Sequence, residues 1–418
     1  MPKGLPARED AAVIVPAPGE LVEKLRGLPA ARPLMSRLAG AAGVYLVGGA
    51  VRDLLLGGRP SDLDLVVEGD AARFARSLGG EARVHDRFGT STITLDGRSY
   101  DVARARRERY AHPGALPDVE PASLAEDLQR RDFTVNAIAM ALGGPRPGEL
   151  SSAQGALEDL DARRLRVLHD TSFIDDPTRI LRMVRYASRL GFAIDPHTRA
   201  LLGGALAGQA LQTVSGSRLG AELRLLAREP DPVRALECLH ELGVDVALHP
   251  ALARSRPAVA RRALELLAPD HRRDRLAIAA AALGVPVGEL RALLDALAFP
   301  AEDRDVIIQA ATRAPELARE LEAAAKPSQI AQSATSAVPE LVALAGALGP
   351  AKQAHAWLTR LRHVRPSISG EDLLAAGVPA GPAIGRGLRA ALAAKLDGTA
   401  SGREGELEAA LRAATQTG

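Results

Sequence analysis

The sequence predicts an α+β protein in which a small mixed sheet near the N-terminus is followed by an all-helical remainder. Short β-rich runs recur between Gly43 and about Leu142, and some are separated by helical stretches. After about Leu165 the strand signals stop, and apolar residues recur at helical periodicity instead. At 418 residues the chain is too long for one compact core, so several domains are expected.

Residues 1–40 read as a Pro-interrupted helical lead-in that contains a helix near Gly19–Gly27. Residues 41–165 form the predicted mixed head, with a helix at Ala71–Leu78. Its expected strands are Val44–Val47, Leu63–Val67, Ser91–Leu95, Tyr100–Ala103 and Val135–Met140. Residues 104–130 read as a long loop, and loops of that length in compact domains are usually functional.

The helical remainder divides into three expected parts, a neck (166–250), a body (251–350) and a tail (351–418). Gly, Pro and Asp punctuate the helices. The expected helices are Ile180–Leu190, Arg218–Ala227, Val233–Leu242, Ala258–Leu267, Glu289–Leu297, Glu316–Ala325 and Arg386–Lys395. The stretch from Lys352 to Arg389 carries a surplus of basic residues around a Gly- and Pro-rich turn. That surplus suits RNA phosphates, although a solvated helix face is the alternative.

Composition excludes several classes of protein. No apolar run reaches 18 residues, so no membrane span is expected, and the N-terminus lacks a signal-peptide pattern. The single Cys238 excludes an intrachain disulfide framework and a cysteine zinc cluster. We therefore expect a cytoplasmic protein. A net charge of only +2 argues against a uniformly basic nucleic-acid binder.

The strongest local signal is a strand that runs into Gly48-Gly49, with a helix expected near Val51. Glycines let backbone N–H groups approach a triphosphate, and Arg52 is placed to clamp a phosphate or the nucleotide. Asp62 and Asp64 follow within about twenty residues. On a strand, side chains at i and i+2 share a face, so these two carboxylates converge.

Two converging carboxylates repel each other unless a cation lies between them, and oxygen ligands suit Mg²⁺. A magnesium site of this kind activates a hydroxyl and stabilises a leaving pyrophosphate. Asp62 and Asp64 are the predicted catalytic and metal-binding residues. Asp101, at the start of a strand-like run, is a candidate third catalytic acid, with an ordinary strand-end Asp as the alternative.

Gly48-Gly49-x-x-Arg52-Asp53 followed by Asp62-x-Asp64 resembles the head of the polymerase-β-type nucleotidyltransferases. Within that group it is similar to the class II tRNA nucleotidyltransferase and bacterial poly(A) polymerase family, whose second motif is matched by Arg130–Ala137. The resemblance implies a polymerase-β-type head with helical neck, body and tail. It also implies nucleotide and ribose contacts from Arg131 and Asp132, with Asn136 as a further candidate.

Asp175-Asp176-x-x-Arg179 resembles the family's base-reading motif, which usually begins with Glu. Cytosine and adenine each present an amino donor beside a ring-nitrogen acceptor. The resemblance implies that the Asp176 carboxylate accepts from the amino group and that Arg179 donates to the ring nitrogen. Arg182 and Arg185 recur at helical spacing with Arg179 and would steady the triphosphate or base. A solvated arginine face is the alternative.

The resemblance implies an enzyme that adds C and A residues to the tRNA 3′ end from CTP and ATP, with Mg²⁺ as cofactor. Addition of A alone, addition of CC alone and poly(A) synthesis remain alternatives within the family. The segment Pro113–Pro117 looks somewhat like that of A-adding members. A non-catalytic helical RNA-binding protein is the alternative of another class. The sequence does not predict an oligomeric state.

Overall fold

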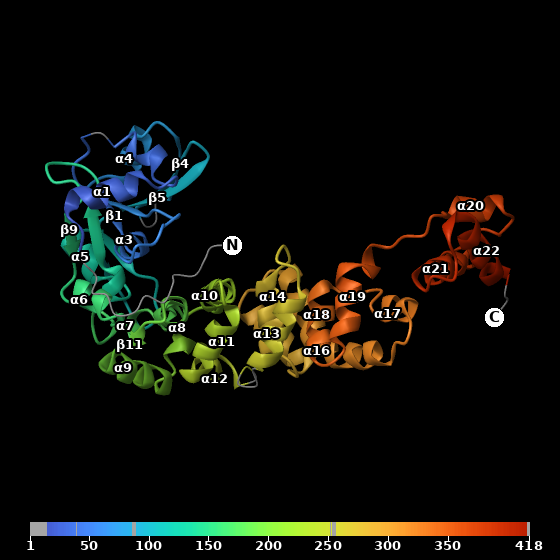
Figure 1. The fold of residues 1–418 in the computed structure, drawn as a ribbon. Helices are drawn as coiled ribbons and strands as arrows, with labels where there is room; N and C mark the ends of the chain where they lie inside the picture. The colour runs from blue at the N-terminus through green and yellow to red at the C-terminus, as the bar shows by residue number, and fades with distance from the viewer. Residues whose placement is uncertain (1–14, 39, 86–88, 251, 253–255, 416–418) are drawn as a thin grey trace. The chain divides into compact units, whose positions relative to one another are not determined.

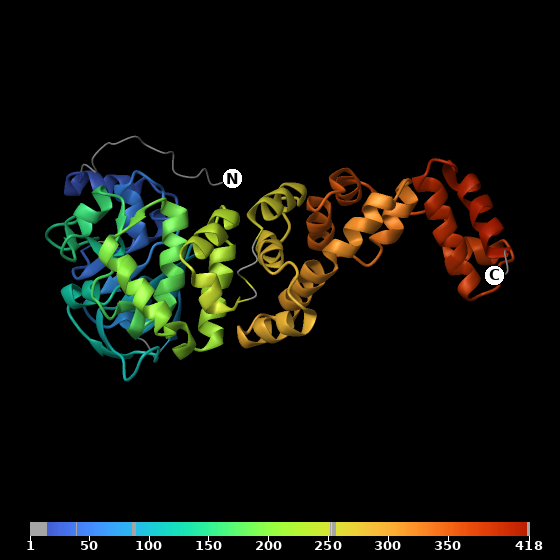
Figure 2. The ribbon, with the colours of Figure 1, turned by 90° about the horizontal axis from the view of Figure 1, so that it is seen from below.

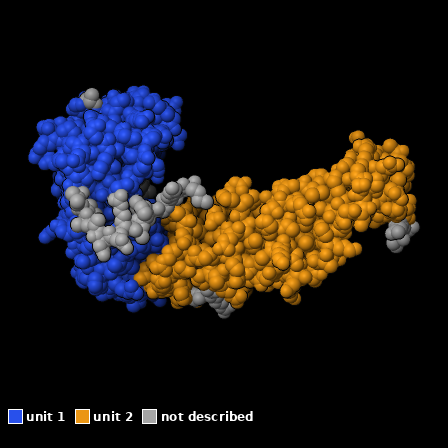
Figure 3. All heavy atoms as spheres, viewed as in Figure 1, with its two compact units in different colours: residues 1–222 blue, residues 223–418 orange. Residues whose placement is uncertain are grey.

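The computed structural model describes residues 15–38, 40–85, 89–250, 252 and 256–415. The chain divides into two compact units, residues 1–222 and 223–418, which are coloured separately in Figure 3. The boundary falls within helix α10 (Gly216–Ala227). The finer division of the helical part into neck, body and tail stays a prediction.

The first unit is built around one seven-stranded sheet, in the order β3-β4-β5-β2-β1-β8-β9 (Figure 1). Its strands are β1 (Val44–Val47), β2 (Leu65–Val67), β3 (Glu81–His85), β4 (Thr90–Leu95), β5 (Arg98–Arg104), β8 (Ile138–Ala141) and β9 (Leu150–Ser152). Neighbouring strands run antiparallel except β2 and β5, which are parallel, so the predicted mixed sheet is confirmed.

Two further strand pairs lie outside the sheet. They are β6 (Arg106–Arg109) with β7 (Asp118–Pro121), which form a hairpin, and β10 (Arg164–Leu165) with β11 (Ala193–Ile194). The reading of residues 104–130 as a loop was therefore wrong, because this segment contains the hairpin and a helix. The predicted strand Val135–Met140 was also wrong at its start, because Thr134–Asn136 form a 3-10 turn that precedes β8.

Helices pack on both ends of the sheet, with α4 against β2 to β5 and α3 against β1 and β8. A core of small and apolar side chains includes Val47, Val66 and Ala139. The helices of this unit are α1 (Pro18–Arg26), α2 (Arg32–Met35), α3 (Gly49–Leu55), α4 (Ala71–Ser77), α5 (Leu124–Gln129), α6 (Ala156–Asp161), α7 (Ser172–Asp175), α8 (Thr178–Leu190), α9 (Pro196–Ala207) and the start of α10.

The described residues of the second unit form helices and connecting loops without strands, and Figures 1 and 2 show its last two long helices, α21 and α22, side by side. Its helices are α11 (Pro232–Glu241), α12 (Val244–Leu248), α13 (Pro257–Leu266), α14 (Arg273–Ala281), α15 (Val287–Ala296), α16 (Ala301–Ala323), α17 (Pro327–Ser333), α18 (Pro339–Ala347), α19 (Ala351–Thr359), α20 (Gly370–Ala375), α21 (Pro382–Leu396) and α22 (Gly402–Thr415). All seven predicted helices overlap helices of the structure: three lie wholly within α8, α10 and α21, and the other four end one or two residues beyond the observed helices. None of the helices described is both long and apolar enough to cross a bilayer.

Candidate active site

Asp62 and Asp64 lie on the segment that leads into β2. Leu63 and Leu65 are 2% and 1% exposed, whereas the two aspartates are exposed, so the predicted alternation of faces holds. The regular strand begins only at Leu65, two residues later than predicted. The Val47 N–H still donates to the Asp64 carbonyl at 3.1 Å, which ties this segment to β1.

Asp101 lies on β5, next to β2 in the sheet. Leu65 pairs with Val102 in the parallel register, so one step earlier Asp64 stands opposite Asp101. Paired positions on neighbouring strands project to the same face. Asp101 alternates with buried neighbours and accepts a hydrogen bond from Thr92 Oγ1 at 2.7 Å. The sheet register therefore brings this third predicted acid beside the first two.

The pKa of Asp64 reflects the charged side chains around it. Its carboxylate is accessible at one side, yet loss of hydration to the surrounding protein raises its pKa. The negative charges of Asp101 and Asp62 raise this pKa further, whereas the positive charges of Arg131 and Arg182 lower it. A cation bound beside Asp64 would offset this repulsion and stabilise its charged form.

These residues fit a magnesium ion held by Asp62 and Asp64. Within the part of the chain that is described, no group of three or more His, Cys, Asp and Glu side chains is arranged to hold a metal by itself. Magnesium in phosphoryl-transfer sites commonly takes one or two carboxylates and fills its remaining positions with phosphate oxygens and water. Two carboxylates with an open side therefore suit this ion.

The glycine turn connects β1 to α3. Gly48 has a φ of +67°, in the left-handed region, and its N–H donates to the Ile138 carbonyl at 3.0 Å. A Cβ added at Gly48 would lie 3.1 Å from Nη1 of Arg131. Helix α3 follows the turn as predicted, but it begins at Gly49, two residues earlier than the expected start near Val51. The turn therefore brings the N-terminal end of α3 close to the Arg131 guanidinium.

Arg52 does not lie where the sequence placed it. Its side chain is buried, at 1% exposure, so a direct clamp on a phosphate is not available in this structure. The guanidinium donates to Asn136 Oδ1 at 2.5 Å and to Asp53 Oδ1 at 2.8 Å, and lies 5.4 Å from the ring centre of Tyr186. Burial with full pairing is typical of a residue that positions its neighbours.

Asp132 and Asn136 belong to the same buried network. Asp132 Oδ1 accepts from the Phe133 N–H and from Asn136 Nδ2, and Oδ2 accepts two N–H groups of Arg182 at 2.7 and 2.9 Å. Burial raises the pKa of Asp132, but Arg182 and Asn136 outweigh it and hold the pKa at about 2. Of the residues predicted to contact ribose, Arg131 is the more accessible one, and it is held by Asp127.

Helix α8 carries the arginine series. Arg182 and Arg185 both pair with Glu222, and both lie over the ring of Tyr186, at 5.6 and 5.0 Å from its centre. With Arg52, this ring is contacted by three guanidinium groups. Arg182 also lowers the pKa of Asp64, so the helix and the carboxylates share one site. A solvated arginine face is thereby excluded, because Arg179 and Arg185 are buried.

Asp176 stands just before α8. Its Oδ1 accepts from the backbone N–H and the hydroxyl of Thr178, at 3.1 and 2.6 Å, and from Arg218 at 2.8 Å. Among the described residues, no donor bonds its Oδ2. Pro177 is the N-cap residue of α8, and the Asp176 side chain bonds the first helical N–H from one residue before it. The neighbouring Asp175 accepts from the hydroxyl of Thr171 instead.

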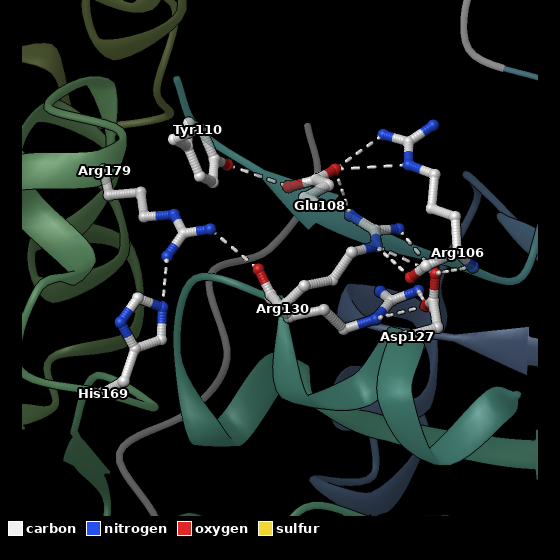
Figure 4. Close-up of polar contacts among 8 residues, drawn as sticks. Arg106, Glu108, Tyr110, Asp127, Arg130, His169 and Arg179 are labelled. Carbon is white, nitrogen blue, oxygen red and sulfur yellow. Dashed lines mark hydrogen bonds and ion pairs between the residues drawn. The ribbon is translucent and has the colours of Figure 1, made fainter. Parts of the chain in front are cut away.

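Arg179 reaches from α8 toward the hairpin (Figure 4). Its Nη2 donates to the Arg130 carbonyl at 2.7 Å, and its Nη1 donates to Ser172 Oγ at 2.8 Å. It lines a hollow of about 540 Å³ together with Tyr110 and Asp175. None of the three candidate catalytic carboxylates lines this hollow. The hollow is therefore distinct from the place where these carboxylates meet.

Glu108 on β6 joins the hairpin to the rest of the head. It accepts from Arg106, from Arg130 Nη1 at 2.9 Å and from the Tyr110 hydroxyl at 2.8 Å (Figure 4). Burial, followed by the Glu108 charge, raises the pKa of Tyr110. The sequence prediction missed Glu108, Tyr186, Arg218 and Glu222. Each of them has at least one partner distant in the chain, such as Arg130 for Glu108 and Gly114 for Arg218, which no local pattern reveals.

The head matches known proteins. A family model described as the poly A polymerase head domain matches residues 44–166. The A-adding tRNA nucleotidyltransferase of Geobacter sulfurreducens is 44% identical over 238 residues, which are 54% of this chain and 27% of that protein. The CC-adding tRNA nucleotidyltransferase of Deinococcus radiodurans is 42% identical over 220 residues, or 51% of this chain and 58% of that protein. The chain thus spans about a quarter to somewhat over half of these relatives' lengths.

Solved structures are similar over nearly the whole chain. A CCA-adding enzyme in apo form II has a TM-score of 0.80 at 30% identity, covering 95% of this chain and 99% of that one. The Thermotoga maritima CCA-adding enzyme complexed with tRNA has a TM-score of 0.75 at 28% identity, covering 95% and 98%. The similarity therefore includes the helical part as well as the head.

Proposed function

Since this chain belongs to the class II tRNA nucleotidyltransferase and bacterial poly(A) polymerase family, we propose that it adds C and A residues to the 3′ end of tRNA. The nucleotides come from CTP and ATP, pyrophosphate leaves, and the reaction takes place in the cytoplasm. No template strand is required, because side chains of the protein read the incoming base.

The observation that carries this proposal is the sheet register. The parallel pairing of β2 and β5 sets Asp64 opposite Asp101, with Asp62 two residues away on the same face. Arg131 and Arg182 lie near enough for their positive charges to lower the pKa of the same carboxylate. Negative groups for a divalent cation and positive groups for a triphosphate thus meet at one place, which is what in-line nucleotidyl transfer needs.

Asp62 and Asp64 would hold Mg²⁺, which when bound neutralises phosphate charge and lowers the pKa of the attacking 3′-hydroxyl. Asp101 is the candidate base for the hydroxyl proton. Arg131, beside the Gly48 turn, is placed to contact the triphosphate or ribose. Arg52, buried and paired, holds Asn136 in position and does not itself contact phosphate.

Base reading is assigned to Asp176 and Arg179. Three donors fix Asp176 Oδ1, which leaves Oδ2 to accept from the amino group that cytosine and adenine share. Ser172 and the Arg130 carbonyl hold two of the five N–H donors of Arg179, and another of its donors would bond the ring nitrogen. Uracil and guanine present the opposite donor and acceptor order, and each wrong base costs about 1–3 kcal/mol.

The tRNA partner is supported by the similar T. maritima enzyme, which was solved with tRNA. Basic residues of the second unit are candidate contacts for RNA phosphates. Arg386 and Arg389 on α21 are exposed, beside the glycine-rich turn that precedes this helix. Such contacts position the substrate and weaken as the salt concentration rises.

Three tRNA substrates, ending at the discriminator base, at C and at CC, separate the possible activities. Each is incubated with CTP or ATP alone and with both, and the products are resolved by length. Full CCA addition predicts that all three are extended to CCA when both nucleotides are present. Growth beyond CCA would instead indicate poly(A) synthesis.

Addition of A alone is the second candidate function. It is favoured by the 44% identity to an A-adding relative and by the segment Pro113–Pro117 at the hairpin tip. An A-adding enzyme would extend only the tRNA ending in CC. A CC-adding enzyme would stop at CC on every substrate.

Asp62→Ala tests whether the protein is catalytic at all. We expect the variant to fold and to bind tRNA, while nucleotide transfer falls by several orders of magnitude, because a metal ligand is lost. Glu81→Ala, an exposed carboxylate on β3, is the matched control and should transfer at the parent rate. Equal transfer by Asp62→Ala and the parent would remove the metal assignment. Tight tRNA binding without transfer by the parent would favour a non-catalytic RNA-binding protein.

A further inference from the structure

Thr92 lies on β4, on the same face of the sheet as Asp101. Its neighbours Ser91 and Ile93 alternate with it and are buried on the opposite face. In the antiparallel pairing of β4 with β5, Thr92 stands directly opposite Asp101. Side chains at directly opposed positions of neighbouring strands lie close enough to interact. A residue that the proposed function leaves without a role therefore adjoins the candidate catalytic base.

The Thr92 hydroxyl holds one oxygen of the Asp101 carboxylate. Oγ1 of Thr92 donates to Oδ1 of Asp101 at 2.7 Å, a separation typical of a hydroxyl that is bonded to a carboxylate. Among the residues that the structure describes, no donor is bonded to Oδ2. The terminal torsion of an aspartate has only a broad preference, so a partner at one oxygen decides where the other oxygen points. Thr92 thus sets the direction of Oδ2.

His85 extends this line of contacts to β3, the edge strand. Its Nε2 lies 3.5 Å from Oγ1 of Thr92. The hydroxyl has one proton, which it donates to Asp101, so Oγ1 can only accept from the imidazole. The contact with His85 is longer than the one with Asp101, and it favours the same orientation of the hydroxyl.

The order of the strands places Thr92 on one side of the acids and the triphosphate site on the other. From β4 the sheet continues through β5 with Asp101, then through β2, which follows Asp62 and Asp64, to β1 and the Gly48 turn. In-line transfer requires the attacking oxygen and the leaving pyrophosphate to lie on opposite sides of the phosphorus. Because the Gly48 turn is assigned to the triphosphate, we expect the attacking hydroxyl on the side of β5 and β4.

We propose that Thr92 is a positioning residue, which orients Asp101 to take the proton of the attacking 3′-hydroxyl. In this step the hydroxyl oxygen bonds the α-phosphorus, the bond to pyrophosphate breaks, and the proton passes to Oδ2 of Asp101. Thr92 keeps its own proton and acts only through the carboxylate. This inference rests on the proposed function, because it assumes that Asp101 is the base of a nucleotide transfer.

Substitutions at position 92 separate the hydroxyl from the shape of the side chain. Thr92→Val keeps the branched shape that suits a strand and removes the hydroxyl. We expect its kcat with CTP and with ATP to fall about five- to twentyfold while KM for both nucleotides stays unchanged. Thr92→Ala should show the same loss. Thr92→Ser retains the hydroxyl and should recover most of the parent's kcat.

Thr94→Val is the matched control, because it makes the same change on the same strand and face but opposite Ser99. It should transfer nucleotides at the parent rate. Urea unfolding of Thr92→Val should match that of Thr94→Val, so that a lower kcat reflects the site and not a loss of folded protein. His85→Ala should lower kcat less than Thr92→Val, because the hydroxyl still donates to Asp101.

Asp101→Ala shows whether Thr92 acts through the carboxylate. Asp101→Ala alone should lower kcat more than Thr92→Val, because the base itself is lost. Adding Thr92→Val to Asp101→Ala should then lower kcat no further, since the carboxylate that Thr92 orients is gone. A contact that only stabilised the sheet would lower kcat equally with and without the Asp101 side chain.

Parent-like kcat in Thr92→Val or in Asp101→Ala would overturn the positioning role. So would a Thr92→Ser variant no faster than Thr92→Val, a larger loss in His85→Ala than in Thr92→Val, or additive effects in the double variant. A parent protein that adds neither nucleotide to any tRNA end would instead refute the proposed function. The two failures are distinguishable, because the first set of results requires an active parent.

Discussion

The buried carboxylate of Asp132 offers a test of the network that holds the head to helix α8. It accepts four hydrogen bonds, two at each oxygen, from Phe133, Asn136 and Arg182. Asp132→Asn keeps the shape but replaces one oxygen with a donor. Two of the four bonds are then lost, and a donor faces either Arg182 or the Phe133 and Asn136 donors.

The cost of Asp132→Asn follows from the pKa of the native group. A folded pKa of about 2, against about 3.9 in an unfolded chain, corresponds to roughly 2–3 kcal/mol at neutral pH. Hydrogen bonds to a charged group give a similar figure, about 1.5–3 kcal/mol. The Arg182 side chain is 31% exposed, so water can solvate it in the variant. We therefore expect a loss near the lower end, about 2 kcal/mol.

The pH dependence has a definite sign. Because folding lowers the pKa of Asp132, its stabilisation is present above the unfolded pKa of about 3.9 and is lost as the pH falls toward about 2. The difference in the free energy of unfolding between the parent and Asp132→Asn should therefore be constant from neutral pH down to about 5 and roughly halved near pH 3. A gap that widened in acid would contradict the buried ion pair.

Urea unfolding can be followed separately in the two units. All four tyrosines, at 45, 100, 110 and 186, lie in residues 1–222, whereas Trp357 is in the second unit. Asp132→Asn should shift the unfolding transition reported by tyrosine fluorescence (the tyrosine transition) to lower urea. It should leave the transition reported by Trp357 (the tryptophan transition) in place. Asp118→Asn, the same chemical change at an exposed position on β7, is the control and should shift neither. Identical tyrosine transitions in Asp132→Asn and the parent would refute the reasoning.

Three further outcomes are expected. Gly48→Ala should cost about 1–2 kcal/mol through its left-handed φ and raise KM for both nucleotides by displacing Arg131, which denaturation and steady-state kinetics check. Chelation with EDTA should stop nucleotide transfer but not tRNA binding, and transfer in excess chelator would contradict the magnesium assignment. Asp274→Asn should move only the tryptophan transition to lower urea. The reason is that burial raises the pKa of Asp274, but Arg272 and Arg228 outweigh burial and hold this pKa at about 2. These arginines are 42% and 52% exposed, so screening leaves roughly 1 kcal/mol, and an unmoved transition would show that the pairing contributes nothing.

The sequence could predict the carboxylates because their signal is local. Alternation of Asp62 and Asp64 with buried leucines holds on the extended segment before β2, even where the regular ladder has not begun. The glycine turn and the arginine spacing of α8 are equally local. Asp101 needed one further fact, the parallel register of β2 and β5, which no pattern within either strand reveals.

What the sequence could not predict depends on distant partners. β6 reads Arg-Arg-Glu-Arg and is stabilised by its hairpin partner and by ion pairs, so it lacks the apolar alternation that marks a strand. Arg52 looked like a phosphate ligand by its position after the glycines. Its burial depends on Tyr186, 134 residues later, and on Asn136, which lie together only in the fold.

The one parallel pairing in the sheet also decides where the chain tolerates change. Backbone hydrogen bonds between β2 and β5 fix the separation of Asp64 and Asp101, and the intervening α4, β3 and β4 form an excursion between them. Extra residues at the Asp96-Gly97 turn that closes this excursion would lengthen it without changing the β2–β5 register. This turn is therefore a natural place to insert a reporter domain or an affinity tag while keeping the spacing of the acids.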